Sequence, residues 1–110
     1  MAGRQRLIVG ISGASGSIYG IRLLQALREL GIESHLVMTK AAEMTLRYET
    51  DTNAAALRTQ ADTHYPIGDI GAAIASGSFP TLGMIVAPCS VHTLAEIATG
   101  VTANLLTRAA

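Results

Sequence analysis

The sequence is poor in the residues that mark several protein classes. It has one cysteine, Cys89, no tryptophan and one phenylalanine. A single cysteine excludes an internal disulfide, so a reducing compartment, the cytoplasm, is expected. Charged residues make up only 15% of the chain and the formal net charge is zero, so no charge excess favours nucleic acid or an anionic membrane surface. The apolar run near the N-terminus is broken at once by serine and glycine, so neither a signal peptide nor a membrane span is predicted.

Hydrophobic residues make up 49% of the 110 residues, enough for a packed core. We expect one domain over residues 1–110, without repeats or linkers. A small chain that is this apolar is expected to bury surface against partner subunits or against a further part of the polypeptide. The last predicted helix, Asn104–Ala110, has no stop signal, so we expect the sequence to be the N-terminal part of a longer domain.

The first forty residues predict a strand, a glycine loop, a helix and a second strand. Arg6–Ile11 is apolar nearly throughout, as in a parallel strand covered on both faces. Ile18–Leu30 has a helical stripe of apolar residues, with Gly31 to close the helix. Glu33–Met38 is the second strand. With the loop Ser12–Gly16 these elements form a right-handed βαβ unit, which indicates an α/β fold with a parallel sheet.

The rest of the chain predicts further helices and a third strand, and hence a three-stranded sheet. We expect Met44 and Leu46 to pack from one helix, and Leu94, Ile97 and Ala98 from another. The predicted helices are Ala41–Tyr48, Ala54–Gln60, Ile70–Ala75, Ser90–Thr99 and Asn104–Ala110, and the strand is Leu82–Ala87.

The most informative motif is the run Gly10–Gly16, between the first strand and the first helix. Glycines let main-chain N–H groups approach a ligand, and a helix N-terminus favours an anion. Ser12, Ser15 and Ser17 add hydroxyl donors. We interpret the run as a phosphate-binding loop, the alternative being a tight turn without a ligand.

The spacing of the motif limits the identity of the phosphate ligand. Glycines at 10, 13 and 16 do not match the dinucleotide fingerprint, and no lysine follows as in a Walker loop. A dehydrogenase with this glycine spacing remains an alternative, but such a protein usually has an acidic residue after the second strand to bind the ribose hydroxyls. Met38, Thr39 and Lys40 stand there instead, so NAD is disfavoured, while Thr39 offers a hydroxyl.

A second candidate segment, Ala87–His92, follows the third predicted strand. Ligands in open α/β sheets bind at the carboxyl ends of the strands. Ser90 is a natural N-cap, and the main-chain N–H groups of Val91 and His92 are placed to donate to a ligand. Cys89 with His92 would be a nucleophile and its base, but without a third orienting group we favour a small buried cysteine.

Other titratable residues have weaker patterns. Glu49 and Asp51 close the second predicted helix, where a carboxylate could act as an acid or base, although a solvated helix end is the commoner outcome. His35 is expected to be packed in its strand, and His64 to lie in a loop without a partner. No group of His, Cys, Asp and Glu has metal-ligand spacing.

Several segments together are characteristic of one family. In this order and spacing they resemble the UbiX-type flavin prenyltransferases, of the flavin-containing Cys decarboxylase superfamily. The segments are Arg6–Gly20, His35–Ala42, Glu49–Asp51, Ser76–Phe79 followed by Gly83–Ser90, and Leu105–Ala110.

The resemblance implies a Rossmann-like (flavodoxin-like) three-layer α/β/α fold with a parallel sheet, truncated here, and a homo-oligomer, a dodecamer in the family. It implies transfer of a dimethylallyl group from dimethylallyl phosphate to N5 and C6 of reduced FMN, without a metal. A UbiD-type decarboxylase would then use the prenylated FMN, in ubiquinone synthesis or aromatic acid decarboxylation.

The resemblance also implies site residues. Ser15 and Glu49 are implied as catalytic, Ser15 near the phosphate chemistry and Glu49 beside the flavin and prenyl group. The positions implied to bind FMN are Gly13, Ala14, Ser15, Thr39, Cys89, Ser90, Val91 and His92.

Two alternatives stay open beside the prenyltransferase. One is a flavin-dependent Cys decarboxylase of the same superfamily, and the other is a non-catalytic FMN-binding or assembly module. The glycine loop, Glu49–Asp51 and Ser76–Phe79 favour the prenyltransferase. The non-catalytic reading gains weight because the family's second half, which supplies Arg, Lys, Glu and Tyr groups for the phosphates, has no counterpart in these residues.

Overall fold

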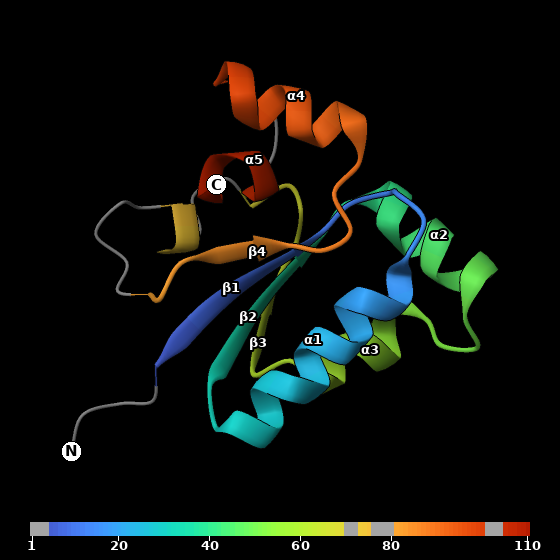
Figure 1. Cartoon of the computed structure of the whole chain (residues 1–110), viewed down its shortest axis with the longest axis vertical. Coiled ribbons are helices and arrows are strands. Elements are labelled where there is room, and N and C mark those ends of the chain that lie inside the picture. The colour runs from blue at the N-terminus through green and yellow to red at the C-terminus, as the bar shows by residue number, and fades with distance from the viewer. Residues whose placement is uncertain (1–4, 70–72, 76–80, 101–104) are drawn as a thin grey trace.

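The structure, a computed structural model, describes residues 5–69, 73–75, 81–100 and 105–110. Strands and helices follow one another along the chain (Figure 1). The strands are β1 (Arg6–Ile11), β2 (Glu33–Met38), β3 (Thr63–Tyr65) and β4 (Met84–Val86). The helices are α1 (Ser17–Leu30), α2 (Lys40–Glu49), α3 (Ala54–Gln60), the 3₁₀ turn η1 (Ala73–Ala75), α4 (Val91–Thr99) and α5 (Leu105–Ala109).

The described strands form one parallel sheet in the order β3-β2-β1-β4. β1 and β2 pair along their whole length, from Arg6 opposite Glu33 to Ile11 opposite Met38. On its other side β1 pairs with β4, with Val9 opposite Ile85. Because the strands are parallel, the loops that leave β1, β2 and β4 all emerge at the same edge of the sheet.

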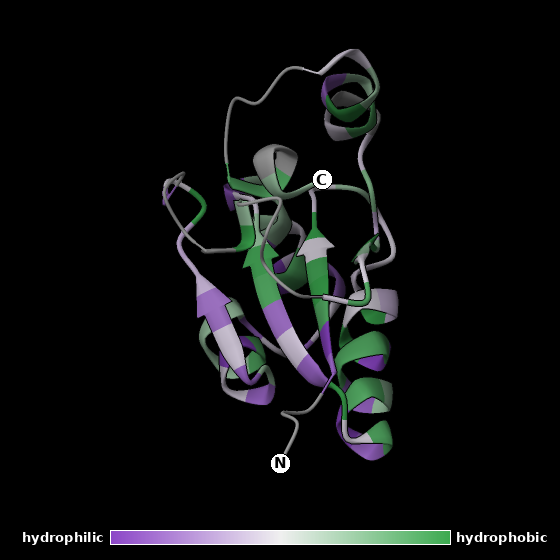
Figure 2. Cartoon of the chain, turned by 90° about the vertical axis from the view of Figure 1, so that its left-hand side faces the viewer, coloured by the Kyte–Doolittle hydropathy of each residue, from purple (hydrophilic) through white to green (hydrophobic). Residues whose placement is uncertain are grey.

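Alternate residues of β1 enter two separate hydrophobic cores, as expected for a strand covered on both faces. Leu7, Val9 and Ile11 pack with residues of α1, α2 and α3. Ile8 packs with residues of η1 and α5 in the second core. Figure 1 shows the two groups of helices on opposite sides of the sheet, and Figure 2 shows hydrophobic stretches of the strands between them. The predicted three-layer α/β/α fold is therefore confirmed.

The predicted bounds of β1, β2 and α3 agree with the structure, but the predicted three-stranded sheet is wrong. Thr63–Tyr65 forms a fourth strand, parallel to β2, with His64 opposite Leu36. The expectation that His64 lies in a loop is thus also wrong. A strand of three residues at a sheet edge is too short to show an alternating pattern, and therefore sequence periodicity does not reveal it.

Three residues that were expected to pack inward are exposed. Met44 on α2 is 53% exposed and Leu94 on α4 is 58% exposed, while Ala98 is also exposed. Leu46 is buried and Ile97 packs against the second core, as expected. Of the predicted helix Ile70–Ala75, residues 73–75 form η1 and the rest lies outside the described residues, as do Ser76–Phe79 and Asn104.

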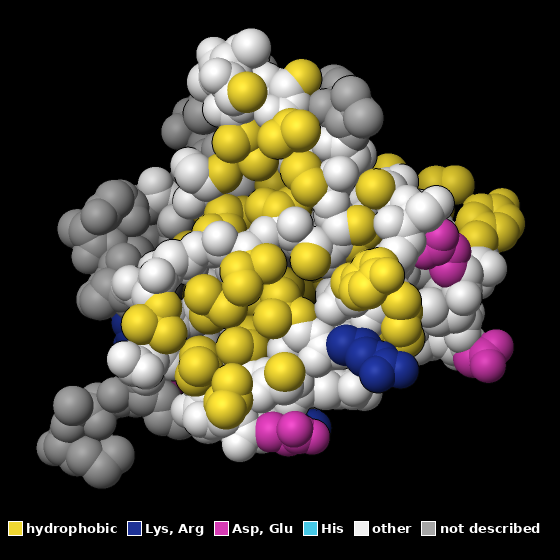
Figure 3. All heavy atoms as spheres, viewed as in Figure 1, with side chains coloured by type: hydrophobic (Ala, Val, Ile, Leu, Met, Phe, Trp, Pro, Cys, Tyr) yellow, Lys and Arg dark blue, Asp and Glu magenta, His cyan; other side chains and the backbone are white. Residues whose placement is uncertain are grey.

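Hydrophobic side chains also lie open to solvent along β4 and α4. β4 is an edge strand in the described sheet, and Leu82 and Ile85 are exposed on it or beside it. Figure 3 shows hydrophobic side chains gathered in the middle of this face of the molecule. Among the described residues, no helix has both the length and the hydropathy that crossing a bilayer requires.

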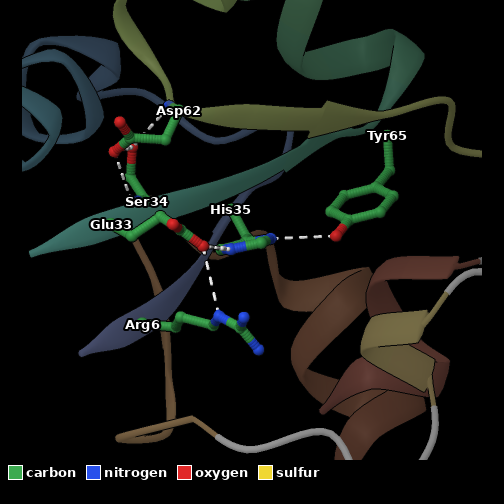
Figure 4. A network of polar contacts seen from close by, with 6 residues as sticks. All are labelled: Arg6, Glu33, Ser34, His35, Asp62 and Tyr65. Atoms are coloured by element: carbon green, nitrogen blue, oxygen red, sulfur yellow. Dashed lines mark hydrogen bonds and ion pairs between the residues drawn. The ribbon is translucent and has the colours of Figure 1, made fainter. Parts of the chain in front are cut away.

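A polar network joins β1, β2 and β3 on the side of the sheet where β1 and β2 begin (Figure 4). The ring of His35 is buried, with Nε2 2.6 Å from Glu33 Oε2 and Nδ1 2.9 Å from the Tyr65 hydroxyl. Arg6 Nε lies 3.2 Å from the same Glu33 oxygen. Burial and the Glu33 charge raise the pKa of Tyr65, so its hydroxyl stays protonated. The expectation that His35 is packed is confirmed, and its contacts are structural.

We predict that Tyr65→Phe lowers the free energy of unfolding by about 1 kcal/mol, because a part-buried hydrogen bond to His35 is lost. Chemical denaturation of the wild-type and Tyr65→Phe proteins measures the difference in their free energies of unfolding. Tyr48→Phe is the matched control, since that side chain is 86% exposed and should change stability by less than about 0.5 kcal/mol. Equal effects of both substitutions would contradict the prediction.

Candidate functional site

Three chain segments meet at the carboxyl edge of the sheet. The glycine loop follows β1, Thr39 follows β2, and the segment Ala87–Ser90 follows β4. The Thr39 N–H donates to the Ile11 carbonyl over 3.0 Å. A Cβ added to Gly13 would lie 2.6 Å from the Cβ of Ala41, so the loop rests directly on the first turn of α2. The structure thus brings the sequence-predicted segments together.

Three helices begin at this edge, and their N-termini are capped in different ways. The Thr39 hydroxyl accepts from the Ala42 N–H over 3.0 Å at the start of α2. The Ser90 hydroxyl accepts from the Thr93 N–H over 3.1 Å at the start of α4, which confirms Ser90 as an N-cap. Gly16, at φ 101°, begins α1 without a side-chain cap of its own. Three partially positive helix ends therefore converge on one region, which favours a bound anion.

Glu49, the last residue of α2, supplies the missing cap of α1. Its Oε1 accepts hydrogen bonds from the main-chain N–H groups of Gly16 and Ser17, each over 3.0 Å. The Ser17 N–H, followed by the Gly16 N–H, lowers the pKa of this carboxyl below its usual value, while desolvation opposes the shift. Glu49 is therefore an ionised group at the site, exposed to solvent as the commoner outcome has it, and in addition bonded to the start of α1.

The bonds to Glu49 reduce the number of groups in the glycine loop that are open to a ligand. The amides of Gly16 and Ser17 are already engaged by Glu49. Ser12 and Ser17 are buried, so the expectation that they present hydroxyls to a ligand is wrong. Ser15 is exposed. The part of the loop open to a phosphate is therefore the stretch Gly13–Ser15.

The other predicted site residues lie along the same edge. Thr39 is half-buried, and its hydroxyl, though it accepts from α2, retains a proton to donate. Cys89 is half-buried, with its sulfur 3.6 Å from the Ser90 carbonyl oxygen. Val91 and His92 form the first turn of α4, and their side chains lie outside the described part of the structure. Contacts of these residues with a flavin stay a prediction.

A second connection within the site, besides the bonds of Glu49 to α1, has no signal in the sequence. The Ser12 hydroxyl donates to the Pro88 carbonyl oxygen over 3.0 Å and accepts from the Ser90 N–H. No local pattern could reveal a contact between residues so far apart along the chain. Within the described ranges, no group of three or more His, Cys, Asp and Glu is placed to hold a metal ion.

The fold and the site define a class of protein. The chain matches the Flavoprotein family over residues 1–110, and it belongs to that family. Within the family it is similar to proteins named flavin prenyltransferase UbiX. It is 52% identical to the one from Thauera aromatica over 105 residues, which cover 96% of this chain and 54% of that protein. It is 56% identical to the one from Escherichia coli K12 over 107 residues, with coverage of 96% and 57%.

Solved structures agree with this assignment. The crystal structure of AnUbiX in complex with FMN and dimethylallyl pyrophosphate matches with a TM-score of 0.95 and 47% identity, over 96% of this chain and 56% of that one. A dodecameric FMN-dependent UbiX-like decarboxylase from Escherichia coli O157:H7 matches with a TM-score of 0.93 and 48% identity, over 96% and 58%. The resemblance to UbiX seen in the sequence is confirmed. The chain spans little more than half the length of these relatives.

We predict that the contribution of Glu49 to stability depends on pH. A carboxyl whose pKa is lowered by folding stabilises the protein above the pKa of the unfolded chain, near 4.5, and this contribution is lost as pH falls through the folded value. Wild type should therefore be more stable than Glu49→Gln at pH 7, with a gap that narrows as the pH falls below 4.5. Thermal unfolding of both proteins between pH 3 and 7 measures the gap. A gap of constant size over that range would contradict the assignment.

Proposed function

We propose that this chain forms part of a flavin prenyltransferase, which transfers a dimethylallyl group from dimethylallyl phosphate to reduced FMN. The observation that carries the proposal is the convergence of the loop after β1, the N-cap of α2, the segment before α4 and the Glu49 carboxylate at one edge of the sheet. The likeness to AnUbiX, whose structure holds FMN and dimethylallyl pyrophosphate, supports it.

The residues present fit FMN as a ligand. A Cβ on Gly13 would lie only 2.6 Å from the Cβ of Ala41 on α2. Glycine at this position therefore lets the loop backbone lie directly against the first turn of α2. Ser15 is exposed, and its hydroxyl, which lies close enough to the Glu49 carboxyl to lower the pKa of that group, has one proton to donate. We infer that Gly13–Ser15, Thr39 and Cys89–His92 contact FMN, with the starts of α2 and α4 favouring its negative charge.

The chain's own groups suit the chemistry of prenyl transfer. Reduced FMN supplies the nucleophilic N5 and C6 positions, and the reaction breaks the carbon–oxygen bond of the allylic phosphate. Ser15 donates a hydrogen bond to the departing phosphate. Glu49 is ionised, because two main-chain N–H groups stabilise its charge, and it supplies negative charge near the developing allylic cation. The lowered pKa makes the same carboxylate a weak base, so we infer that its charge contributes more than its ability to accept a proton from the flavin.

The assembly and the biological setting are part of the same proposal. We infer a homo-oligomer, because hydrophobic residues such as Leu94, Ile85 and Met44 are exposed, and the relative from Escherichia coli O157:H7 is dodecameric. We infer that a UbiD-type decarboxylase receives the prenylated FMN, and that the protein works in the cytoplasm.

The test of the function is product formation. The protein, in the length that its gene encodes, is incubated with FMN and dimethylallyl phosphate under reducing conditions, and the flavin is analysed by mass spectrometry. A flavin that has gained one dimethylallyl group is the expected product. Bound FMN without that product would favour a non-catalytic flavin-binding module, and absence of FMN binding would overturn the proposal.

Two substitutions separate the proposed roles. Glu49→Gln should lower kcat by about 100-fold while FMN affinity changes little, because a neutral amide supplies no charge and accepts no proton. Ser15→Ala should raise KM for dimethylallyl phosphate, because a phosphate contact is lost. Steady-state kinetics measures both, with Thr59→Ala, an exposed position on α3, as the control. Wild-type values in both site variants would refute the residue assignments.

A further inference from the structure

Ser12 is a residue of the glycine loop whose hydroxyl faces the interior of the protein. It is 1% exposed. The hydroxyl donates to the Pro88 carbonyl oxygen over 3.0 Å and accepts from the main-chain N–H of Ser90. The main-chain N–H of Ser12 donates to the same Pro88 oxygen, also over 3.0 Å. Three hydrogen bonds thus connect the loop after β1 with the segment after β4.

Both connected segments belong to the proposed flavin site. Gly13–Ser15 follows Ser12 directly, so the backbone of Ser12 sets where the exposed part of the loop begins. Ser90 is the N-cap of α4 and holds its first turn through the bond from the Thr93 N–H. A shift of Ser90 would therefore move the start of α4 relative to the glycine loop.

We propose that Ser12 is a positioning residue for FMN, whose hydroxyl sets the spacing between the two flavin-binding segments without itself contacting the flavin. This inference rests on the proposed function. Burial makes a direct contact unavailable, since the hydroxyl is enclosed and bonded on both sides. The hydroxyl acts by preorganisation, because FMN then binds to segments that are already held together.

Removal of the hydroxyl has two local consequences. The Ser90 N–H loses its acceptor in a part-buried position, and the Pro88 oxygen keeps one of its two donors. An unsatisfied donor of this kind costs free energy unless the segment moves to find water. One of the three hydrogen bonds then remains, so the two segments are held less tightly and FMN binding has to restore their spacing.

The test compares Ser12→Ala with Ser34→Ala. Ser34 is a matched control because it is also buried, at 2% exposed, and its hydroxyl also accepts a main-chain bond from a distant residue, the N–H of Asp62, over 3.1 Å. It lies near the start of β2, at the opposite end of the sheet from the flavin site. Both substitutions remove one buried hydroxyl, so a general effect on folding should appear in both.

The measurements are the FMN dissociation constant, from quenching of flavin fluorescence, the visible absorption spectrum of bound FMN, and the melting temperature. Ser12→Ala should weaken FMN binding by about tenfold and shift the bound spectrum toward that of free FMN, as expected for one lost hydrogen bond. Ser34→Ala should lower the melting temperature similarly and change FMN affinity by less than about twofold. Unchanged affinity and spectrum in Ser12→Ala, or an equal loss of affinity in both variants, would overturn the proposal.

The outcomes separate this inference from the proposed function. If the wild-type protein does not bind FMN, the proposed function itself is contradicted. If the wild-type protein binds FMN and Ser12→Ala binds it equally well, only the proposed role of Ser12 is contradicted. If Ser12→Ala does not fold, Ser12→Cys keeps the shape of the side chain, with a larger terminal atom that is a weaker donor and acceptor. Weaker FMN binding by that variant supports the proposal, and wild-type affinity counts against it.

Discussion

The hydrogen-bonded pairing of β1 on both of its edges is the interaction on which the rest of the structure depends. β2 pairs with β1 on one side and β4 on the other, all in the parallel direction. Parallel pairing requires a crossover on a face of the sheet, and the helices that make these crossovers bury both faces. The same pairing carries the ends of β1, β2 and β4 to one edge. The site therefore lies where it does because three strands share a direction.

Polar groups at that edge are largely satisfied by the protein itself. Glu49 accepts the two amides at the start of α1, and Ser12 bonds to the segment before α4. Such bonds compete with a ligand for the same donors, so they restrict which parts of the glycine loop a ligand can use. They also hold the segments in place before a ligand arrives, which reduces the ordering that binding requires. The site thus combines a rigid frame with a short accessible stretch, Gly13–Ser15.

The sequence predicted those parts of the fold that have a strong local pattern. The bounds of β1 were correct because a nearly continuous apolar run is typical of a buried parallel strand. Those of β2 were also correct, although its first three residues, Glu33–His35, are polar. The sheet was nevertheless predicted one strand short, since Thr63–Tyr65 pairs through its backbone at an edge and carries no pattern. Met44 and Leu94 were predicted inward because helical spacing shows which residues share a face, not whether another element covers that face.

The sequence by itself determined the βαβ unit, the glycine loop, the capping role of Ser90 and the resemblance to UbiX, since each of these is carried by neighbouring residues or by motifs in a recognisable order. Only the tertiary structure decided that Glu49 caps α1 and that Ser12 joins the loops after β1 and β4. The reason is physical. Local preferences act between residues a few positions apart, whereas these contacts join residues 32 to 78 positions apart. Such residues meet only after the sheet has formed and aligned the ends of its strands.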